Sequence, residues 1–125
     1  MSRDVVTTGK IAKPAGPFSA AVRRDGLVFV SGQIAQDPTT GALREGDAAV
    51  QAEQVLRNLT AVVEAAGRSL DDVIRVGVYL RDMDDFAAVN AVYERFFTAP
   101  YPARTAIGVA ALPLGAVVEM DAVVG

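Results

Sequence analysis

The sequence predicts a single α+β domain in which two helices cover one face of a mixed β-sheet. Two segments carry apolar residues at three- and four-residue spacing, which is the period of an amphipathic helix. Several other segments are short, rich in β-branched residues and bounded by turn signals, as strands are. A length of 125 residues fits one domain, 1–125, better than two.

The first third of the chain indicates a β-hairpin. Residues 18–22 lead into Asp25-Gly26, a strong two-residue turn signal, and residues 27–31 return as an apolar second strand. A further turn is expected at 37–41, where a proline fixes one backbone dihedral and a glycine permits a positive one.

The clearest helix is expected at 47–66, with Asp47 as its cap and Gly67 in the left-handed position at its end. Its apolar stripe consists of Ala52, Val55, Leu56, Leu59, Val62, Val63 and Ala66. A second helix is expected at 83–97, capped by Asp82. Its apolar face carries Phe86, Val89, Tyr93, Phe96 and Phe97.

Three further strands are expected at 73–80, 103–110 and 117–123, the last two joined by a turn around Pro113 and Gly115. The element order is then β-β-α-β-α-β-β. The second face of such a sheet keeps apolar residues and has no helix to cover it. We therefore expect an oligomer in which these faces are turned inward.

The composition excludes several classes of function. With no histidine and no cysteine there is no serine–histidine pair, no thiolate nucleophile and no ordinary zinc site. A net charge of −3 and scattered basic residues argue against a nucleic-acid partner. No apolar run approaches the roughly 20 residues of a membrane span, and the N-terminus lacks a signal-peptide pattern. A cytoplasmic location is expected.

Arg104 is the most informative candidate residue. In a strand from 103 it shares its face with Ala106, Gly108 and Ala110, so small side chains leave space in front of it. It is either an arginine whose guanidinium reaches the surface or an anion-binding residue, since guanidinium matches a carboxylate with two parallel hydrogen bonds.

Four other features are ambiguous when taken alone. Asn90 falls on the apolar face of its helix, where it either bonds a neighbouring backbone group or orders a loop near a site. Glu119 in mid-strand is more typical of a solvated strand face than of a catalyst. Ser31-Gly32 ends a strand, where glycine permits close backbone approach. The acidic pair at 84–85 fits the positive end of a helix dipole better than a metal site.

Taken together, these segments resemble the RidA/YjgF family of reactive intermediate deaminases. The matching stretches are 14–19, 29–33, 37–41, Gln51 with Asn58-Leu59, 82–86, Asn90, Tyr93, Pro102-Ala103-Arg104-Thr105, Leu112-Pro113 and Val118-Glu119. They cover nearly the whole chain in the order and spacing that the family shows.

The resemblance implies a chorismate-mutase-like sandwich assembled as a homotrimer, with sites between subunits and no cofactor or metal. It implies that Arg104 grips the carboxylate of a small imine or enamine acid and that Glu119 orients water. Ser31, Gly32, Phe18, Asn90 and Ala106 would complete the pocket. The implied reaction is hydrolysis of 2-aminoacrylate and 2-iminopropionate to pyruvate and ammonia.

Two positions depart from the family pattern. Active members usually carry tyrosine where this chain has Phe18, and many carry cysteine where it has Ala106. The lost hydroxyl leaves the preferred substrate open. The alternatives are a relative that acts on a pathway-specific imine or enamine and a non-catalytic ligand-binding or chaperone-like trimer. A ribonuclease has little physical support in an acidic chain without histidine.

Overall fold

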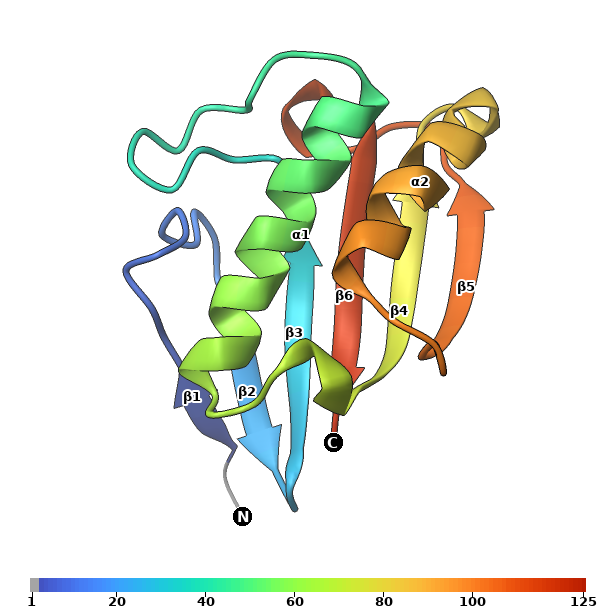
Figure 1. Ribbon diagram of the computed structural model, residues 1–125. Coiled ribbons are helices and arrows are strands. Elements are labelled where there is room, and N and C mark those ends of the chain that lie inside the picture. Colours follow the sequence, from blue (N-terminus) through green and yellow to red (C-terminus); the bar gives the residue numbers. More distant parts are fainter. Residues whose placement is uncertain (1–2) are drawn as a thin grey trace.

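The computed structural model describes residues 3–125 as one mixed sheet with two helices against it (Figure 1). The strands are β1 (Asp4–Val6), β2 (Ala21–Arg24), β3 (Leu27–Gln33), β4 (Val73–Leu80), β5 (Ala103–Gly108) and β6 (Val118–Val124). The helices are α1 (Ala48–Ala65) and α2 (Phe86–Phe96), with short 3₁₀ turns at Leu70–Asp72, Met83–Asp85 and Pro113–Gly115. The predicted α+β class, with both helices on one face, is confirmed.

The strand order across the sheet is β1-β2-β3-β6-β4-β5. The last strand of the chain therefore lies in the centre, antiparallel to both β3 and β4. β5 lies at the edge and runs parallel to β4, which requires the crossover through α2. None of the helices within residues 3–125 is both long and apolar enough to cross a bilayer.

Most of the predicted elements are confirmed. Asp47 caps α1 by accepting a hydrogen bond from the Val50 N–H at 3.0 Å, and Gly67 has a φ of +78°. The Asp25-Gly26 turn has positive φ at both residues, as a type I′ hairpin turn requires. Asp82 caps the 3₁₀ turn that precedes α2 rather than α2 itself.

The prediction was wrong at three strands. It missed β1, whose three residues carry too short a pattern to detect. It began the second strand at 18, whereas β2 begins at Ala21, because the Phe18 N–H turns back to the Gly16 carbonyl. It carried the fifth strand to 110, whereas β5 ends at Gly108.

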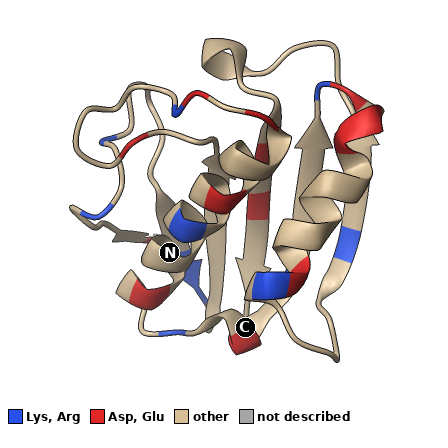
Figure 2. Cartoon of the chain, turned by 45° about the horizontal axis from the view of Figure 1, so that its top comes forward, with Lys and Arg blue, Asp and Glu red and all other residues tan. Residues whose placement is uncertain are grey.

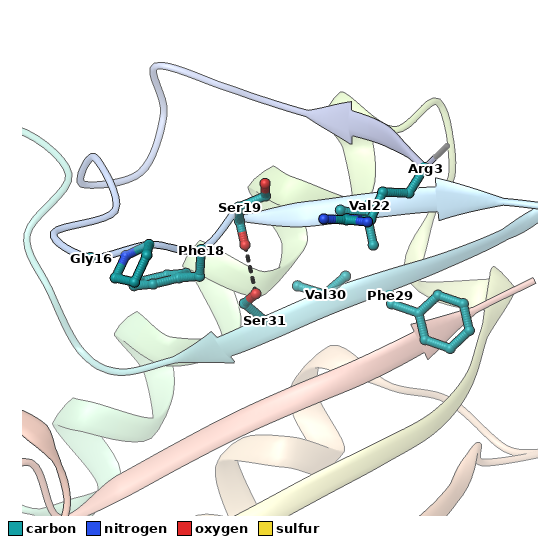
Figure 3. A pocket seen from close by; sticks show the side chains of 9 residues that line it. Arg3, Gly16, Phe18, Ser19, Val22, Phe29, Val30 and Ser31 are labelled. Atoms are coloured by element: carbon teal, nitrogen blue, oxygen red, sulfur yellow. Dashed lines mark hydrogen bonds between the residues drawn. The ribbon is translucent and has the colours of Figure 1, made fainter. Parts of the chain in front are cut away.

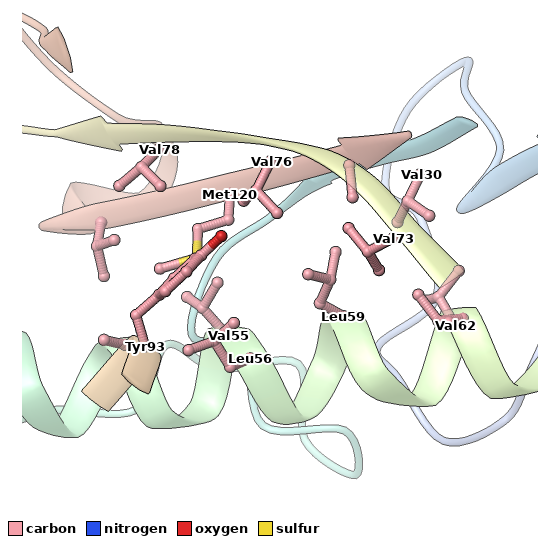
Figure 4. Packing of buried hydrophobic residues seen from close by; sticks show 14 of the residues in the cluster. Val30, Val55, Leu56, Leu59, Val62, Val73, Val76, Val78, Tyr93 and Met120 are labelled. Carbon is pink, nitrogen blue, oxygen red and sulfur yellow. The ribbon is translucent and has the colours of Figure 1, made fainter. Parts of the chain in front are cut away.

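The core fills the space between the helices and the sheet (Figure 4). Leu56, Leu59 and Val62 of α1 are fully buried against Val76, Val118 and Met120 of the sheet, all with 0% exposure. Burying each such side chain contributes about 1.5–3 kcal/mol to folding. This layer fixes which face of every strand is covered, and so which residues the opposite face presents.

Tyr93 is the one buried polar side chain that lacks a hydrogen-bond partner among residues 3–125. Its ring packs on Phe97 at 4.6 Å between centroids, and its hydroxyl points into the layer between the sheet and α1 (Figure 4). An unsatisfied buried hydroxyl costs about 1–3 kcal/mol.

We therefore expect Tyr93→Phe to raise the free energy of unfolding by about 1 kcal/mol, because it removes the hydroxyl and keeps the ring. Denaturant unfolding monitored by circular dichroism measures this. The matched control is Tyr79→Phe, which removes a hydroxyl bonded to Asp121 at 2.9 Å and should be destabilising. A loss of stability in Tyr93→Phe as large as in the control would contradict the assignment.

The second face of the sheet, which we call the open face, has no helix over it (Figure 1). Strand register places Val5, Val22, Phe29 and Val123 side by side on this face. Val5 is 59% exposed and Phe29 44%. The expected apolar, helix-free face is therefore present in the chain.

Candidate functional site

Arg104 lies on the edge strand β5, and three residues of α2 contact its guanidinium. Its Nη1 donates a hydrogen bond of 2.8 Å to Asn90 Oδ1. Its Cζ lies 4.8 Å from the centroid of the Tyr93 ring and 5.5 Å from that of Phe86. Within residues 3–125, no Asp or Glu forms an ion pair with it. The side chain is therefore oriented and exposed, and it makes no ion pair with the residues that the structure describes.

This arrangement corrects one part of the sequence argument. Arg104 is paired with Val76 across the sheet, which places it on the helix-covered face. The space in front of the strand is occupied by α2 and is not left empty by Ala106, whose side chain is half-buried at the core boundary. Two aromatic rings and an amide, rather than small neighbours, set the direction of the guanidinium.

A shallow cavity of about 250 Å³ lies beside Arg104 and is lined by Asn90, Tyr93, Glu94, Tyr101, Pro102 and Arg104. The aromatic partners were on the predicted apolar face of the second helix. Their contact with Arg104 was not predicted, because the parallel crossover that brings α2 over β5 is not visible in the sequence pattern. Five donors on a fixed plane suit this cavity to a carboxylate.

Four other predicted site residues meet in a second cavity, of about 530 Å³. Phe18, Ser31, Gly32 and Glu119 all line it, together with the loop residue Leu114. The Ser31 hydroxyl donates a 2.6 Å hydrogen bond to the Ser19 carbonyl, which ties the end of β3 to the segment that carries Phe18 (Figure 3). Phe18 itself is 55% exposed.

Glu119 lies flat across the backbone of Gly32. A Cβ built at position 32 would come within 2.9 Å of the Glu119 Cδ and closer still to its Oε2. Glycine is therefore needed at 32 to leave room for the carboxyl group, which is a sharper role than the close approach predicted from the sequence. Burial, and then the charge of Asp121, raise the pKa of Glu119 above its ordinary value.

Two buried amides of α1 fix the walls of this second cavity from the core side. Asn58 donates to the carbonyls of Ile34 and Gln36 at 3.1 and 3.0 Å, and Gln51 accepts from the Val117 N–H at 3.0 Å. The loop after β3 and the entry to β6 are thereby attached to the same helix.

The predicted site residues at the Arg104 cavity and those at the Glu119 cavity lie on opposite faces of the sheet. Arg104 and Asn90 are on the helix-covered side, while Glu119 shares the open face with its Cα partner Tyr79. The structure therefore brings Phe18, Ser31, Gly32 and Glu119 together and Arg104 with Asn90 together, but it does not join the two groups within one chain.

A third cavity, of about 580 Å³, adjoins the second on the open face and shares Gly16, Phe18 and Ser31 with it (Figure 3). Its other lining side chains include Val22 and Phe29. Polar side chains, Arg3, Ser19 and Ser31, line it as well. The cavity lies within the uncovered sheet surface described above.

Charge is dispersed over the molecule. Figure 2 shows basic and acidic segments interspersed along both helices and the sheet, with no continuous basic stripe in view. Within residues 3–125 no group of three or more acidic side chains is arranged to hold a metal ion. The aspartates at 84 and 85 are in the 3₁₀ turn that Asp82 caps.

Comparison with known proteins places these features in a family. The family model described as Endoribonuclease L-PSP matches residues 8–125. A RutC family protein of Pyrococcus abyssi is 44% identical over 123 residues, which are 98% of this chain and 97% of that protein. The human 2-iminobutanoate/2-iminopropanoate deaminase is 41% identical over 121 residues, 97% of this chain and 88% of the human one.

The crystal structure of RidA from the Antarctic bacterium Psychrobacter is similar throughout. Its TM-score to this structure is 0.94 at 46% sequence identity, and the match covers 98% of each chain.

Proposed function

The chain belongs to the RidA/YjgF family, and on that premise we propose that it is an enamine and imine deaminase. It converts intermediates of the 2-aminoacrylate and 2-iminopropionate type into 2-keto acids and ammonia. Support comes from the human relative, which carries the name of an imine deaminase at 41% identity.

One observation carries the proposal: the guanidinium of Arg104 is held in place and has no acidic partner within residues 3–125. Asn90 occupies one N–H, and the rings of Tyr93 and Phe86 fix the plane. The remaining donors suit a bidentate pair with a substrate carboxylate.

The complete site is proposed to form between copies of the chain, in a homotrimer. Arg104 and Glu119 lie on opposite faces of one sheet, so a single chain cannot direct both at one small substrate. An edge strand of one copy placed against the open face of the next would bring Arg104 to the cavity of Phe18, Gly32 and Glu119. It would also cover the exposed Val5 and Phe29.

The chemistry needs little from the protein beyond positioning. With the carboxylate fixed, water adds to the electrophilic carbon of the iminium, and the Glu119 carboxylate takes the released proton. The resulting carboxyl group protonates the nitrogen of the carbinolamine. The C–N bond then breaks with its electron pair on ammonia, the hydroxyl proton returns to Glu119, and the ammonia takes that proton away as ammonium.

Substrate preference within this class is set by the cavity around Phe18. Phe18 offers ring surface and no hydroxyl, and Ala106 offers no thiol. A relative acting on one pathway-specific imine is the nearest variant of the proposal. No cofactor or metal is proposed.

Two linked measurements test the proposal. An amino-acid oxidase generates 2-iminopropionate, and the purified chain should accelerate its decay to pyruvate. If decay is unchanged, 2-iminopropionate is not its substrate, and the proposed activity on this class of intermediate is wrong. Light scattering should give three times the chain mass, and a monomer would remove the shared site.

Complementation then tests the site between copies. Arg104→Ala and Glu119→Gln chains should each be inactive alone. Refolded together at equal amounts, they should regain activity in about a quarter of their sites, because each site takes its arginine and its glutamate from different copies at random. A mixture of Arg104→Ala with the double variant has no intact site and is the control. No recovery in the test mixture would place both residues in one chain.

A further inference from the structure

Two acidic side chains on the open face of β6 are turned in opposite directions. Glu119 leans toward β3, over Gly32, and Asp121 leans toward β4, over Gly77. A Cβ at position 77 would collide with Asp121 Oδ1, just as one at position 32 would collide with Glu119. Glycines on the two flanking strands thus provide the space for both carboxylates.

Asp121 is held on its side by two hydrogen-bond donors and one ion pair. Its Oδ1 accepts from the Gly77 N–H at 3.1 Å, and its Oδ2 accepts from the Tyr79 hydroxyl at 2.9 Å. The Arg75 Nη1 lies 3.8 Å from Oδ1. The same bond to Asp121 is the main reason why the pKa of Tyr79 is raised. Glu119, by contrast, accepts no hydrogen bond from any residue within 3–125.

We propose that Asp121 is a positioning residue for Glu119: its anchored negative charge keeps the Glu119 carboxyl group over Gly32 and favours the form that carries a proton. The role of Glu119 in hydrolysis rests on the proposed function. The effect of the Asp121 charge on Glu119 does not depend on that function. In the proposed reaction Glu119 takes a proton from water and then gives it to the departing nitrogen, and a group that does both works best when its pKa lies near the working pH.

The charges that face Glu119 are few. On β6 the facing group is Asp121, and on β4 the facing groups are Tyr79 and, through its ion pair with Asp121, Arg75. The facing residues of β3 and the 3₁₀ turn, Gly32 and Leu114, are uncharged. Among residues 3–125, Asp121 is the like charge that acts on Glu119, and it disfavours the Glu119 carboxylate. In the proposed trimer, the positive charge of Arg104 from a second copy favours the Glu119 carboxylate. This effect is the same in every variant below.

The test is a carbon-13 NMR titration of the glutamate carboxyl carbons. The chain has five glutamates, and Glu119→Gln identifies the signal by its loss. In Asp121→Asn, which removes the charge and keeps an acceptor oxygen, the titration of Glu119 should move to lower pH. In Arg75→Gln, which leaves the Asp121 charge less compensated, it should move to higher pH.

Two further variants separate this charge effect from general perturbation. Tyr79→Phe removes a donor but keeps the Asp121 charge, so the Glu119 titration should stay or rise. Asp25→Asn makes the same change of net charge at the distant hairpin turn and should leave it unchanged. An unmoved Glu119 titration in Asp121→Asn, or an equal fall in Asp25→Asn, would overturn the proposal.

The pH profile of imine hydrolysis should follow the NMR shifts. If the NMR shifts appear and hydrolysis is absent, the proposed function fails while the coupling between Asp121 and Glu119 stands. If hydrolysis is present and its profile ignores both substitutions, the positioning role is wrong and the proposed function is untouched.

Discussion

Replacing Arg104 by lysine is expected to lower kcat/KM for imine hydrolysis by about 30- to 1000-fold, which corresponds to about 2–4 kcal/mol of transition-state stabilisation. Lysine keeps the positive charge near Tyr93 and Phe86 but loses the planar fork that binds a carboxylate through two parallel bonds. Arg104→Ala should be more severe.

Steady-state kinetics and thermal melts of both Arg104 variants measure the effect. The melting temperature should change little, because Arg104 is exposed and is outside the core. Arg95→Lys is the matched control, since Arg95 is on the same helix-covered side but pairs with Glu53 at 3.1 Å. Full activity in Arg104→Lys would remove the bidentate model, and loss of folding in both would make Arg104 a structural residue.

Gly32→Ala is expected to reduce activity by about 10- to 100-fold, at or below the low end of what a general acid–base group contributes, because Glu119 is displaced rather than removed. The added methyl group would displace the Glu119 carboxyl from the backbone of β3. Stability should be nearly unchanged, because the group that moves is the end of a flexible side chain and the φ of Gly32 is not positive.

Gly9→Ala is the matched control for this substitution. Gly9 also lacks a positive φ, and a Cβ there would meet nothing within 4 Å. Comparing the kcat/KM and melting temperature of the two variants isolates the displacement of Glu119. Wild-type activity in Gly32→Ala would show that the position of the Glu119 carboxyl over Gly32 is irrelevant to catalysis.

The helices and most strands could be predicted because their signals are local. The stripe from Ala52 to Ala66 and the caps Asp47 and Gly67 determine α1 within a few turns of chain. The three-residue β1 could not be found, because its pairing with β2 is decided by tertiary contacts. The central place of β6 is likewise a property of the whole sheet.

The candidate site was predicted only as a set of residue types. The alternation of side chains along β6 places Glu119 and Asp121 on one face, and this could be predicted from the sequence. The opposite orientations of the two carboxylates could not be predicted from the sequence. They depend on the glycines of β3 and β4 that lie next to them in the sheet. The stacking of Arg104 on α2 was missed because it depends on the parallel crossover that brings α2 over β5.

The cavity on the open face is attached to the core through two buried amides of α1. Asn58 and Gln51 are 2% and 4% exposed, and they hold the loop after β3 and the entry to β6 from inside the core. Either cavity wall can move only if buried hydrogen bonds break. Breaking them requires most of the free energy of global unfolding, unlike a local surface fluctuation. The cavity inherits the rigidity of the core and is shaped before any ligand arrives.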